Sequence, residues 1–450
     1  MVMLILGLGS NVGDRLAHLR GALRLIKTIP GLEVKQVSPV YLSDALLPEN
    51  SPPEWDVPYL NAALRCESTQ PPHDILKKLK AIEKILDRDL RSLRWSPRII
   101  DIDILAWDDT IIQSETLTAP HSNLLERPFA LWPLADVAPL WICPVGTLVG
   151  QTAAQLVEKW GSRFTGQAPF HTRQINQRLD TPQLVGILNV TPDSFSDGGC
   201  YVDAEKALAQ VVHLVHSGAD VIDIGAESTA PQAKPITPAE EWQRLETLLI
   251  AIKEARHHFL VPPKMSIDTR HVETAEKALT WGADWINDVS GLDNRSMRKL
   301  IAQSKTECVV MHHLNIPEVR QHSLPRNQDP VPSVYEWGKQ RLEELEQEGI
   351  ARENIIFDPG IGFGKMAEQS LVLLQHAQQF TQLGVRVLIG HSRKTFISLF
   401  SGLPFIERDI ETLVIALKLA EQGIDYLRVH DVEMCARGLK VAAAMGQGIK

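Results

Sequence analysis

The chain has 450 residues, of which 44% are hydrophobic and 22% are charged, and its formal net charge is -9. This length is typical of two domains, the negative charge argues against a nucleic-acid partner, and the lack of any apolar run of roughly 18 residues argues against a membrane span. The five cysteines are scattered, never form a C-x-x-C pair and offer neither a disulfide framework nor a zinc site, so we expect a reducing, cytoplasmic location.

Hydrophobic spacing in the N-terminal third predicts strands and helices without a regular repeat. Their order, strand-helix-strand-strand-helix-strand, is that of a ferredoxin-like α+β domain. We place this domain at residues 1–160, a polar linker at 161–182 and a second domain at 183–450. The expected strands are Met3–Leu8, Glu33–Tyr41 and Tyr59–Glu67, the expected helices are Asp14–Ile29 and Asp74–Leu86, and a fourth strand follows that contains Asp101 and Asp103.

Those two aspartates are the most informative pair in the first domain. Residues two apart in a strand point to the same face, so Asp101 and Asp103 are expected to be neighbours. Carboxylates this close repel each other unless cations bind between them, and the arginines just upstream have a fork geometry suited to phosphate oxygens. Spacing alone leaves two interpretations open: a hard-cation site for Mg-nucleotide chemistry, and a solvated acidic strand face.

The second domain is expected to be an α/β TIM barrel, (βα)8. From Leu184 onward, eight short apolar strands alternate with longer amphipathic helices, and polar residues gather at the C-terminal strand ends, where such barrels have their active sites. A doubly wound open sheet is the alternative, but no Gly-rich dinucleotide fingerprint opens a helix. The expected strands are Leu184–Asn189, Val221–Gly225, Lys264–Asp268, Trp285–Val289, Glu307–Met311, Asn354–Asp358, Val385–Ile389 and Tyr426–Val429.

The stretch Arg94–Asp103 resembles the signature of hydroxymethyldihydropterin pyrophosphokinases, which transfer a pyrophosphoryl group from ATP to a pterin alcohol. Gly7–Asn11, Tyr59–Ala63 and Pro120–Leu134 fit the same family, so the resemblance covers most of residues 1–160. It implies that Asp101 and Asp103 hold two Mg2+ ions on the triphosphate of ATP. It also implies ATP contacts for Glu83, Arg88, Arg94, Trp95, Arg98, His121 and Arg127, with Arg98 acting beside the aspartates, and pterin contacts for Ser43, Tyr59, Asn61 and Phe129.

Some positions leave alternatives or depart from that family's pattern. Tyr59 or Phe129, taken alone, is explained better by plain core packing. The segment Ser43–Ala45 lacks the usual prolines, Lys80 stands where a glutamine is usual, and Ser96 replaces a glycine. These changes leave the metal site untouched and concern the pterin and adenosine contacts.

The segment Gly186–Gly199 is similar to the first-loop signature of dihydropteroate synthases, which join p-aminobenzoate to a dihydropterin and expel pyrophosphate. Seven further segments agree in order, so the resemblance spans about residues 183–445. It implies a TIM barrel that is a sulfonamide target and forms homodimers through the barrel. The seven segments are Asp223–Thr229, Ser266–Thr269, Ile286–Gly291, Met311–His312, Asp358–Lys365, Ser392–Lys394 and Arg428–Asp431.

The resemblance also implies a division of the barrel residues among three ligand groups. Lys394, Arg428 and His430 are expected to be catalytic, with the last two acting as cations on the departing pyrophosphate beside one Mg2+ near Asn189. Asp288 and Asp431 are expected to be strand-end caps or ion-pair partners. The pyrophosphate set is Asn189, Thr229, Arg428 and His430; the pterin set is Asp268, Asn287, Asp358, Phe363 and Lys394; the p-aminobenzoate set is Thr191, Pro192, Phe195 and Ser392.

One departure concerns charge. The family's second loop usually has an arginine where this chain has Ala230, and Lys234 offers a point charge in place of that fork. The stretch Met311–Asn315 also differs from the usual pattern. We expect weaker binding of the pyrophosphate ester as a result.

The leading hypothesis is a two-domain folate-biosynthesis enzyme that performs consecutive steps on small-molecule substrates. Its N-terminal domain would make hydroxymethyl-dihydropterin pyrophosphate from ATP, and its barrel would convert this product to 7,8-dihydropteroate. Two alternatives remain open: a barrel that binds a methylated folate for methyl transfer, and a pterin-binding protein with only one active half.

Overall fold

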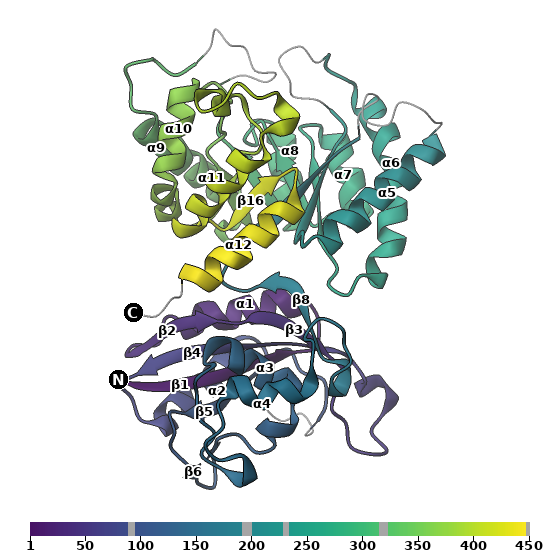
Figure 1. Ribbon diagram of the computed structural model, residues 1–450. Coiled ribbons are helices and arrows are strands. Elements are labelled where there is room, and N and C mark those ends of the chain that lie inside the picture. The colour runs from purple at the N-terminus through teal and green to yellow at the C-terminus, as the bar shows by residue number, and fades with distance from the viewer. Residues whose placement is uncertain (89–94, 191–199, 228–233, 315–322, 447–450) are drawn as a thin grey trace. The chain divides into compact units, whose positions relative to one another are not determined.

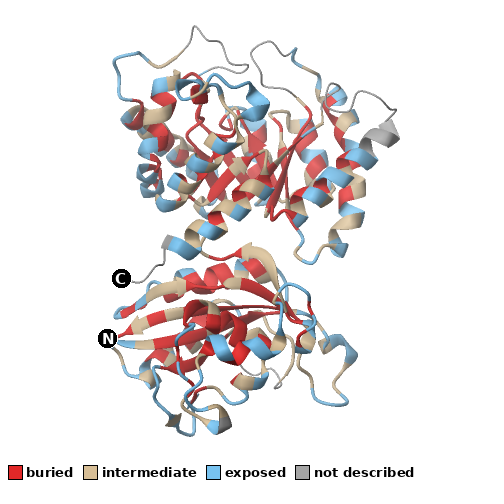
Figure 2. Ribbon diagram, in the orientation of Figure 1, coloured by how far each residue is buried: buried red, intermediate tan, exposed pale blue. Residues whose placement is uncertain are grey.

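The computed structural model describes residues 1–88, 95–190, 200–227, 234–314 and 323–446, and it divides the chain into two compact units. Unit 1 comprises Met1–Asp180 and Ala443–Lys450, and unit 2 comprises Thr181–Ala442 (Figure 1). Each unit encloses its own buried residues (Figure 2). Within the described parts of the chain, none of the helices combines the length and apolarity needed to cross a membrane.

Unit 1 is built on an antiparallel sheet with the strand order β5-β1-β4-β3-β8, and β2 also pairs with β4. The first four elements of that order reproduce the ferredoxin-like arrangement, so the predicted α+β class is confirmed. The strands are β1 (Val2–Ser10), β2 (Leu32–Val37), β3 (Pro39–Ser43), β4 (Tyr59–Ser68), β5 (Asp101–Trp107) and β8 (Arg173–Arg178), with the short pair β6 (Ile112–Gln113) and β7 (Thr118–Ala119) apart from them.

The single strand expected at Glu33–Tyr41 is two strands, because the chain breaks at Ser38. The Ser38 N–H donates to the carbonyl of Ala63 at 2.9 Å, and its hydroxyl accepts from the Ala63 N–H at 2.9 Å. These bonds satisfy the backbone at the break. The helices of this unit are α1 (Arg15–Ile26), α2 (Pro72–Ile85), α3 (Pro128–Val137) and α4 (Ala153–Val157), and α3 and α4 pack with Ile5, Tyr41 and Leu105 into one core.

The segment 161–182, expected to be a linker, instead contains β8, which pairs with β3 at the edge of the sheet. Hydrophobic spacing gave no sign of this strand, because its residues are polar and only half-buried. Backbone pairing and one arginine hold it: Arg178 donates to the Val37 carbonyl at 2.6 Å and forms a forked pair with Asp180 at 2.9 Å. Unit 1 therefore extends to Asp180.

Unit 2 is a closed barrel of eight parallel strands, so the predicted (βα)8 fold is confirmed. Inside the barrel, Trp285 and Tyr426 meet edge to face with ring centroids 4.9 Å apart. The helices surround the strands (Figure 1). The strands are β9 (Gln183–Asn189), β10 (Val221–Gly225), β11 (Lys264–Asp268), β12 (Trp285–Asp288), β13 (Glu307–Met311), β14 (Ile355–Asp358), β15 (Arg386–Ile389) and β16 (Tyr426–Val429); the helices are α5 (Cys200–His216), α6 (Pro238–Ala255), α7 (Val272–Thr280), α8 (Arg295–Ser304), α9 (Pro330–Gln347), α10 (Ala367–Gln375), α11 (Asp409–Glu421) and α12 (Val432–Gly446).

A Gly-x-Asp pattern recurs where β10, β12 and β16 begin. Each glycine follows a helix and has a positive φ that favours glycine, and each aspartate accepts a hydrogen bond from a backbone N–H of the preceding strand. This pattern sets the register at the N-terminal end of the barrel and leaves the opposite end for polar residues. The bonds join Asp220 to Leu184 at 2.9 Å, Asp284 to Met265 at 2.8 Å and Asp425 to Val387 at 2.8 Å.

Candidate active sites

In unit 1, a cavity opens on the face of the sheet that carries Asp101 and Asp103. The register places Gly9 between Asp101 on one side and Asn61 on the other, and a Cβ at Gly9 would lie 3.5 Å from the Asn61 side chain. Small residues on β1 thus leave room above the strand. The cavity is lined by Gly7, Leu8, Gly9, Ser43, Asp44, Leu46, Leu47, Tyr59, Asn61, Ala62, Trp95, Arg98, Asp101, Asp103, Leu105, His121, Arg127, Phe129 and Ala130.

Cationic side chains surround the two aspartates. Asp101 pairs with Arg88 at 2.7 Å and with Arg98 at 3.1 Å, whereas Asp103 has Lys80 at 3.8 Å. Burial alone would raise the pKa of Asp101, but Arg88 and Arg98 outweigh it and hold that pKa below its ordinary value. For Asp103, burial and the charge of Asp101 raise the pKa to about 6. Asp101 takes the two arginines, and Asp103 is left with the more distant Lys80.

Glu83 was expected at the nucleotide, but the structure gives it another position. Its side chain is fully buried and does not line the cavity. One of its oxygens, Oε1, accepts from the Ile102 N–H at 2.7 Å and contacts Arg88 at 2.6 Å and Lys80 at 2.8 Å. Glu83 thus fixes the strand between the two aspartates and orients the arginine that pairs with Asp101.

The wall of the cavity opposite these charges is aromatic and amide-bearing. The Asn61 amide donates to the Ser43 hydroxyl at 3.0 Å, which leaves its carbonyl oxygen for a ligand. Phe129 packs edge to face on Phe170, with ring centroids 5.5 Å apart, and burial raises the pKa of the Tyr59 phenol. Sequence analysis missed Asp44, Leu46 and Leu47, which also line the cavity. Of the expected ATP residues, four line the cavity: Trp95, Arg98, His121 and Arg127. Arg88 does not line the cavity but pairs with Asp101, which does, and Arg94 lies outside the described residues.

In unit 2, the C-terminal ends of β10, β11, β12 and β16 bring a buried charge network together. Arg428 donates from Nε to Asp223 at 2.6 Å and from its terminal nitrogen to Asp268 at 2.9 Å. The same Asp223 carboxylate accepts from the Asn287 amide at 3.1 Å and from the Ser266 hydroxyl at 2.5 Å. Burial raises the pKa of Asp268 to about 7, although Arg428 acts in the opposite direction.

Asp223 is the main residue that sequence analysis missed. It is fully buried on β10 and occupies the centre of the network that orients Arg428 and Asn287. A buried carboxylate with this many donors fixes the geometry of its partners. The only signal in the sequence was its place at the start of the segment Asp223–Thr229.

Asp358 and Lys394 converge on the same end of the barrel. A Cβ at Gly390 would lie 3.8 Å from the Asp358 carboxylate and 4.0 Å from the Lys394 ammonium, so both groups lie close to Gly390, which has no side chain. Burial raises the pKa of Asp358, with Lys394 opposing. Lys394 also donates to the Ile361 carbonyl and lies 4.6 Å from the centre of the Phe363 ring. Asp358, Lys394 and Phe363 thus place charged groups beside an aromatic face at this end of the barrel.

The loop after β14 is fixed by a buried lysine that sequence analysis did not single out. Lys365 contacts His312 Nδ1 at 2.7 Å and donates to the carbonyls of Gly360 at 2.8 Å and Phe363 at 2.9 Å. Burial and Lys365 lower the pKa of His312 to about 2, so its ring stays neutral and can accept the proton. A Cβ at Gly360 would lie 1.9 Å from the His312 carbonyl, which explains the glycine.

His430 differs from the expectation that it is a cation. Burial, Arg393 and Arg428 lower the pKa of His430 to about 3, so the imidazole is neutral near pH 7. Its backbone N–H donates to the Ser392 hydroxyl at 3.2 Å, and that hydroxyl lies 2.9 Å from Nδ1. The serine proton is then directed to Nδ1, which leaves Nε2–H as a hydrogen-bond donor.

The remaining expected residues divide into two groups. Asn189 is exposed at the end of β9, and Asp288 and Asp431 are caps as predicted, accepting from the backbone N–H groups of Ser290 and Met434 at 2.8 Å each. Lys234 is exposed. Thr191, Pro192, Phe195, Thr229 and Ala230 lie outside the described residues.

Two family models match separate parts of the chain. One, described as pterin binding enzyme, covers residues 185–430, and the other, described as 7,8-dihydro-6-hydroxymethylpterin-pyrophosphokinase, covers residues 5–139. A folate synthesis bifunctional protein from Chlamydia caviae is 36% identical over 98% of both chains. One from Arabidopsis thaliana is 33% identical over 98% of this chain and 95% of that relative.

Two solved structures illustrate the likeness of the barrel to known proteins. Dihydropteroate synthase from Anaplasma phagocytophilum with bound 6-hydroxymethylpterin-monophosphate is 39% identical with a TM-score of 0.53, covering 58% of this chain and 98% of its own. The Xanthomonas albilineans enzyme with 4-aminobenzoic acid is 34% identical with a TM-score of 0.55, covering 61% of this chain and 96% of its own.

The raised pKa of Asp103 leads to a prediction about the stability of the fold. The folded pKa of Asp103, about 6, lies above its ordinary 3.8, so ionisation destabilises the fold as pH rises through this window. In EDTA at pH 7.5, the Asp103→Asn variant should therefore have a larger free energy of unfolding than the unaltered protein. We expect a difference of only about 1 kcal/mol, because the Asp103 side chain is 42% exposed and solvent screens its charge. Thermal unfolding measures this. The gain should vanish near pH 4, and exposed Asp109→Asn should show none.

Proposed function

The chain belongs to the family of folate synthesis bifunctional proteins, and from this premise we propose how its residues divide two consecutive reactions. The N-terminal domain catalyses ATP-dependent pyrophosphorylation of 6-hydroxymethyl-7,8-dihydropterin, which releases AMP. The barrel catalyses condensation of that product with p-aminobenzoate to 7,8-dihydropteroate and pyrophosphate. The residue roles that follow are our proposals.

In the first reaction, Asp101 and Asp103 would hold two Mg2+ ions. The observation that supports this is the position of the two carboxylates on one wall of the cavity, where burial and the neighbouring Asp101 raise the pKa of Asp103 to about 6. Bound Mg2+ would neutralise charge on the triphosphate as it transfers. Arg98 lines the same cavity and would also meet phosphate oxygens, and Arg88 stays with Asp101 and keeps that carboxylate ionised.

The pterin alcohol would occupy the aromatic side of that cavity. Tyr59 and Phe129 provide flat faces for the ring, and the Asn61 carbonyl oxygen, left open by the bond from its amide to Ser43, would accept from the pterin's amino and N–H edge. This arrangement aligns the hydroxymethyl group with the phosphate side. Alignment is the main contribution expected of the protein in phosphoryl transfer.

In the second reaction, the pterin ring would lie among Asp268, Asn287, Asp358 and Lys394 at the C-terminal end of the barrel. A buried carboxylate that reads a guanidine-like edge discriminates strongly, since an analogue without that edge leaves it unpaired. Lys394 would meet the acceptors of the ring, with Phe363 beneath. Arg428 would face the departing pyrophosphate as a cation, and His430 as a neutral Nε2–H donor, with Ser392 holding its tautomer.

One Mg2+ near Asn189 is proposed for the pyrophosphate in the barrel. The exposed amide carbonyl at the end of β9 is an oxygen donor of the kind Mg2+ accepts, together with the pyrophosphate oxygens themselves. The cation would offset charge on the leaving group. We also propose a cytoplasmic location and the functional boundaries 1–160 and 183–450, within which β8 is a structural extension of the first domain.

A homodimer through the barrel is proposed from an exposed apolar surface. Ile410 and Val414 lie one helical turn apart on α11, with exposed fractions of 69% and 54%. An apolar surface this dense on a folded domain is typical of a protein interface. Five more exposed apolar side chains precede α11 closely in the chain: Leu399, Phe400, Leu403, Phe405 and Ile406.

The two activities should separate by single substitutions that preserve side-chain size. Asp101→Asn should reduce AMP formation by about a thousand-fold, because it weakens cation binding, and should leave condensation of supplied pterin pyrophosphate intact. Asp358→Asn should do the reverse, by about a hundred-fold. Each variant is the control for the other: AMP formation is measured with Mg-ATP and hydroxymethyl-dihydropterin, and condensation is measured separately with supplied pterin pyrophosphate and labelled p-aminobenzoate. If either variant lost both activities while folded, the assignment of independent sites would be wrong.

Asp223 should prove to be a positioning residue. Asp223→Asn can still accept from Asn287 through its carbonyl oxygen and donate to the Ser266 hydroxyl through its amide, but it removes the charge that holds Arg428, so kcat/KM for condensation should fall by about ten- to a hundred-fold. AMP formation should not change. The matched control is Asp288→Asn, another buried carboxylate of the barrel, which accepts hydrogen bonds from the backbone N–H and the hydroxyl of Ser290 in its own turn. Equal effects of the two substitutions would contradict the role.

The double variant Ile410→Asp/Val414→Asp should convert a dimer to a monomer, because charges on this surface cannot be buried against a second copy. Light scattering coupled to size exclusion measures the mass. Ile111→Asp, at an exposed apolar residue of unit 1, is the control and should remain dimeric. A monomeric parent protein would refute the proposal directly.

A further inference from the structure

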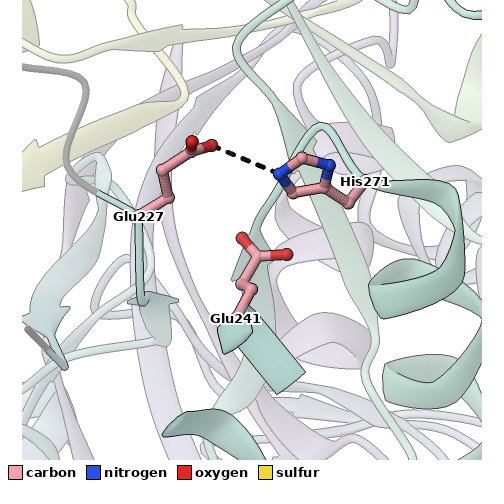
Figure 3. A group of neighbouring side chains, drawn as sticks. All are labelled: Glu227, Glu241 and His271. Carbon is pink, nitrogen blue, oxygen red and sulfur yellow. Dashed lines mark ion pairs between the residues drawn. The ribbon is translucent and has the colours of Figure 1, made fainter. Parts of the chain in front are cut away.

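A group of three side chains from three different elements converges beside the barrel network and has no part in the two reactions. Glu227 follows β10, Glu241 lies in the first turn of α6, and His271 immediately precedes α7. One ligand atom from each lies within 4.8 Å of the others. Figure 3 shows the three side chains pointing toward a common centre.

The atoms that face this centre carry lone pairs that the surrounding described residues leave unused. Glu241 is fully buried, and its Oε1 accepts no hydrogen bond from the described residues, although the Thr274 hydroxyl lies nearby. His271 Nε2 is likewise buried without a hydrogen bond, at 3.6 Å from Glu227 Oε2. Buried polar atoms are normally satisfied, so two orphaned atoms that share one centre indicate a missing ligand.

The other atoms of the group are engaged, and these bonds hold the three ligands in place. Glu227 receives a fork from Arg270, with both bonds at 2.9 Å, and its Oε1 accepts the Ile236 N–H at 3.2 Å. Oε1 therefore has both lone pairs occupied, whereas Oε2 keeps one. Glu241 Oε2 accepts from the Thr269 hydroxyl at 2.7 Å, and the oxygen of that hydroxyl accepts from the backbone N–H of His271 at 3.1 Å.

The charge of the group also favours a cation. Glu227 and Glu241 bring two carboxylates against the one guanidinium of Arg270, and the Asp288 carboxylate also acts on Arg270, whereas Asp268 is already paired with Arg428. A water molecule would satisfy the orphaned atoms but not this excess. A divalent ion would satisfy both.

We propose that Glu227, Glu241 and His271 form a binding site for one divalent transition-metal ion, with Zn2+ the best match. One imidazole nitrogen and two carboxylate oxygens are a donor set that zinc accepts, with its fourth position left to water. The ion would pin the end of β10 and the starts of α6 and α7 to one another. It is distinct from the Mg2+ sites proposed at Asp101, Asp103 and Asn189, and it stands or falls independently of the proposed residue roles.

The test uses the full chain, stripped with chelator and titrated with Zn2+ by calorimetry in a large excess of Mg2+, which occupies the oxygen-only sites. We expect one Zn2+ per chain and a rise in the thermal midpoint, since binding to the folded state stabilises it. Glu241→Gln and His271→Gln should each weaken this binding by at least about ten-fold. X-ray absorption of the bound ion should report one imidazole with the remaining ligands oxygen.

Two controls separate this site from surface binding. His257 and His258 are exposed, with ring centroids 3.9 Å apart, and are the best adventitious zinc site nearby; His258→Gln should leave the stoichiometric binding unchanged. Glu246→Gln alters an exposed carboxylate on the same helix as Glu241 and should also have no effect. Absence of stoichiometric Zn2+ binding by the unaltered protein would overturn the proposal and leave the centre to water. Unchanged Zn2+ binding by the His271→Gln variant would also overturn the proposal. If the Glu241→Gln variant does not fold, the result for His271→Gln is sufficient by itself.

Discussion

Both catalytic halves depend on an arginine held between a fully buried carboxylate and a second carboxylate at the edge of the site. In the first domain the chain of contacts is Glu83–Arg88–Asp101, and in the barrel it is Asp223–Arg428–Asp268. A buried carboxylate is strongly destabilising unless paired, and removing one partner of such a pair costs about 3–5 kcal/mol. The arginine is therefore not free to move, and the orientation of the site carboxylate follows from it.

This arrangement explains why the sites are electrostatically strained in the absence of ligand. The anchored arginines pair with Asp101 and Asp268, yet burial still raises the pKa of Asp268 and also raises the pKa values of Asp103 and Asp358. Such groups lower the stability of the empty protein, and the proposed ligands, a metal ion in one site and a donor-rich ring edge in the other, would relieve them. Pre-organised charge of this kind needs little rearrangement during reaction.

Sequence patterns predicted the parts of this structure that have a period. The eight barrel strands came from apolar runs, and the shared face of Asp101 and Asp103 came from strand alternation. Patterns could not predict contacts between distant segments. Nothing local distinguishes Glu83, whose burial depends on β5, or Asp223, whose partner Arg428 is 205 positions away. The strand β8 was missed for the same reason, since pairing with β3 and not apolar burial creates it.

Two loops at the C-terminal end of the barrel strands, those after β14 and β15, are also held by hydrogen bonds of charged side chains. The loop after β14 is closed by the Lys365 ammonium, which bonds to carbonyls within its own loop and to a neutral histidine. A forked pair between Arg393 and Asp409 ties the loop after β15 to α11, with both bonds at 2.7 Å. These contacts use polar groups where apolar packing would have closed the site. The loops after β14 and β15 are therefore held in place without apolar side chains packed across them.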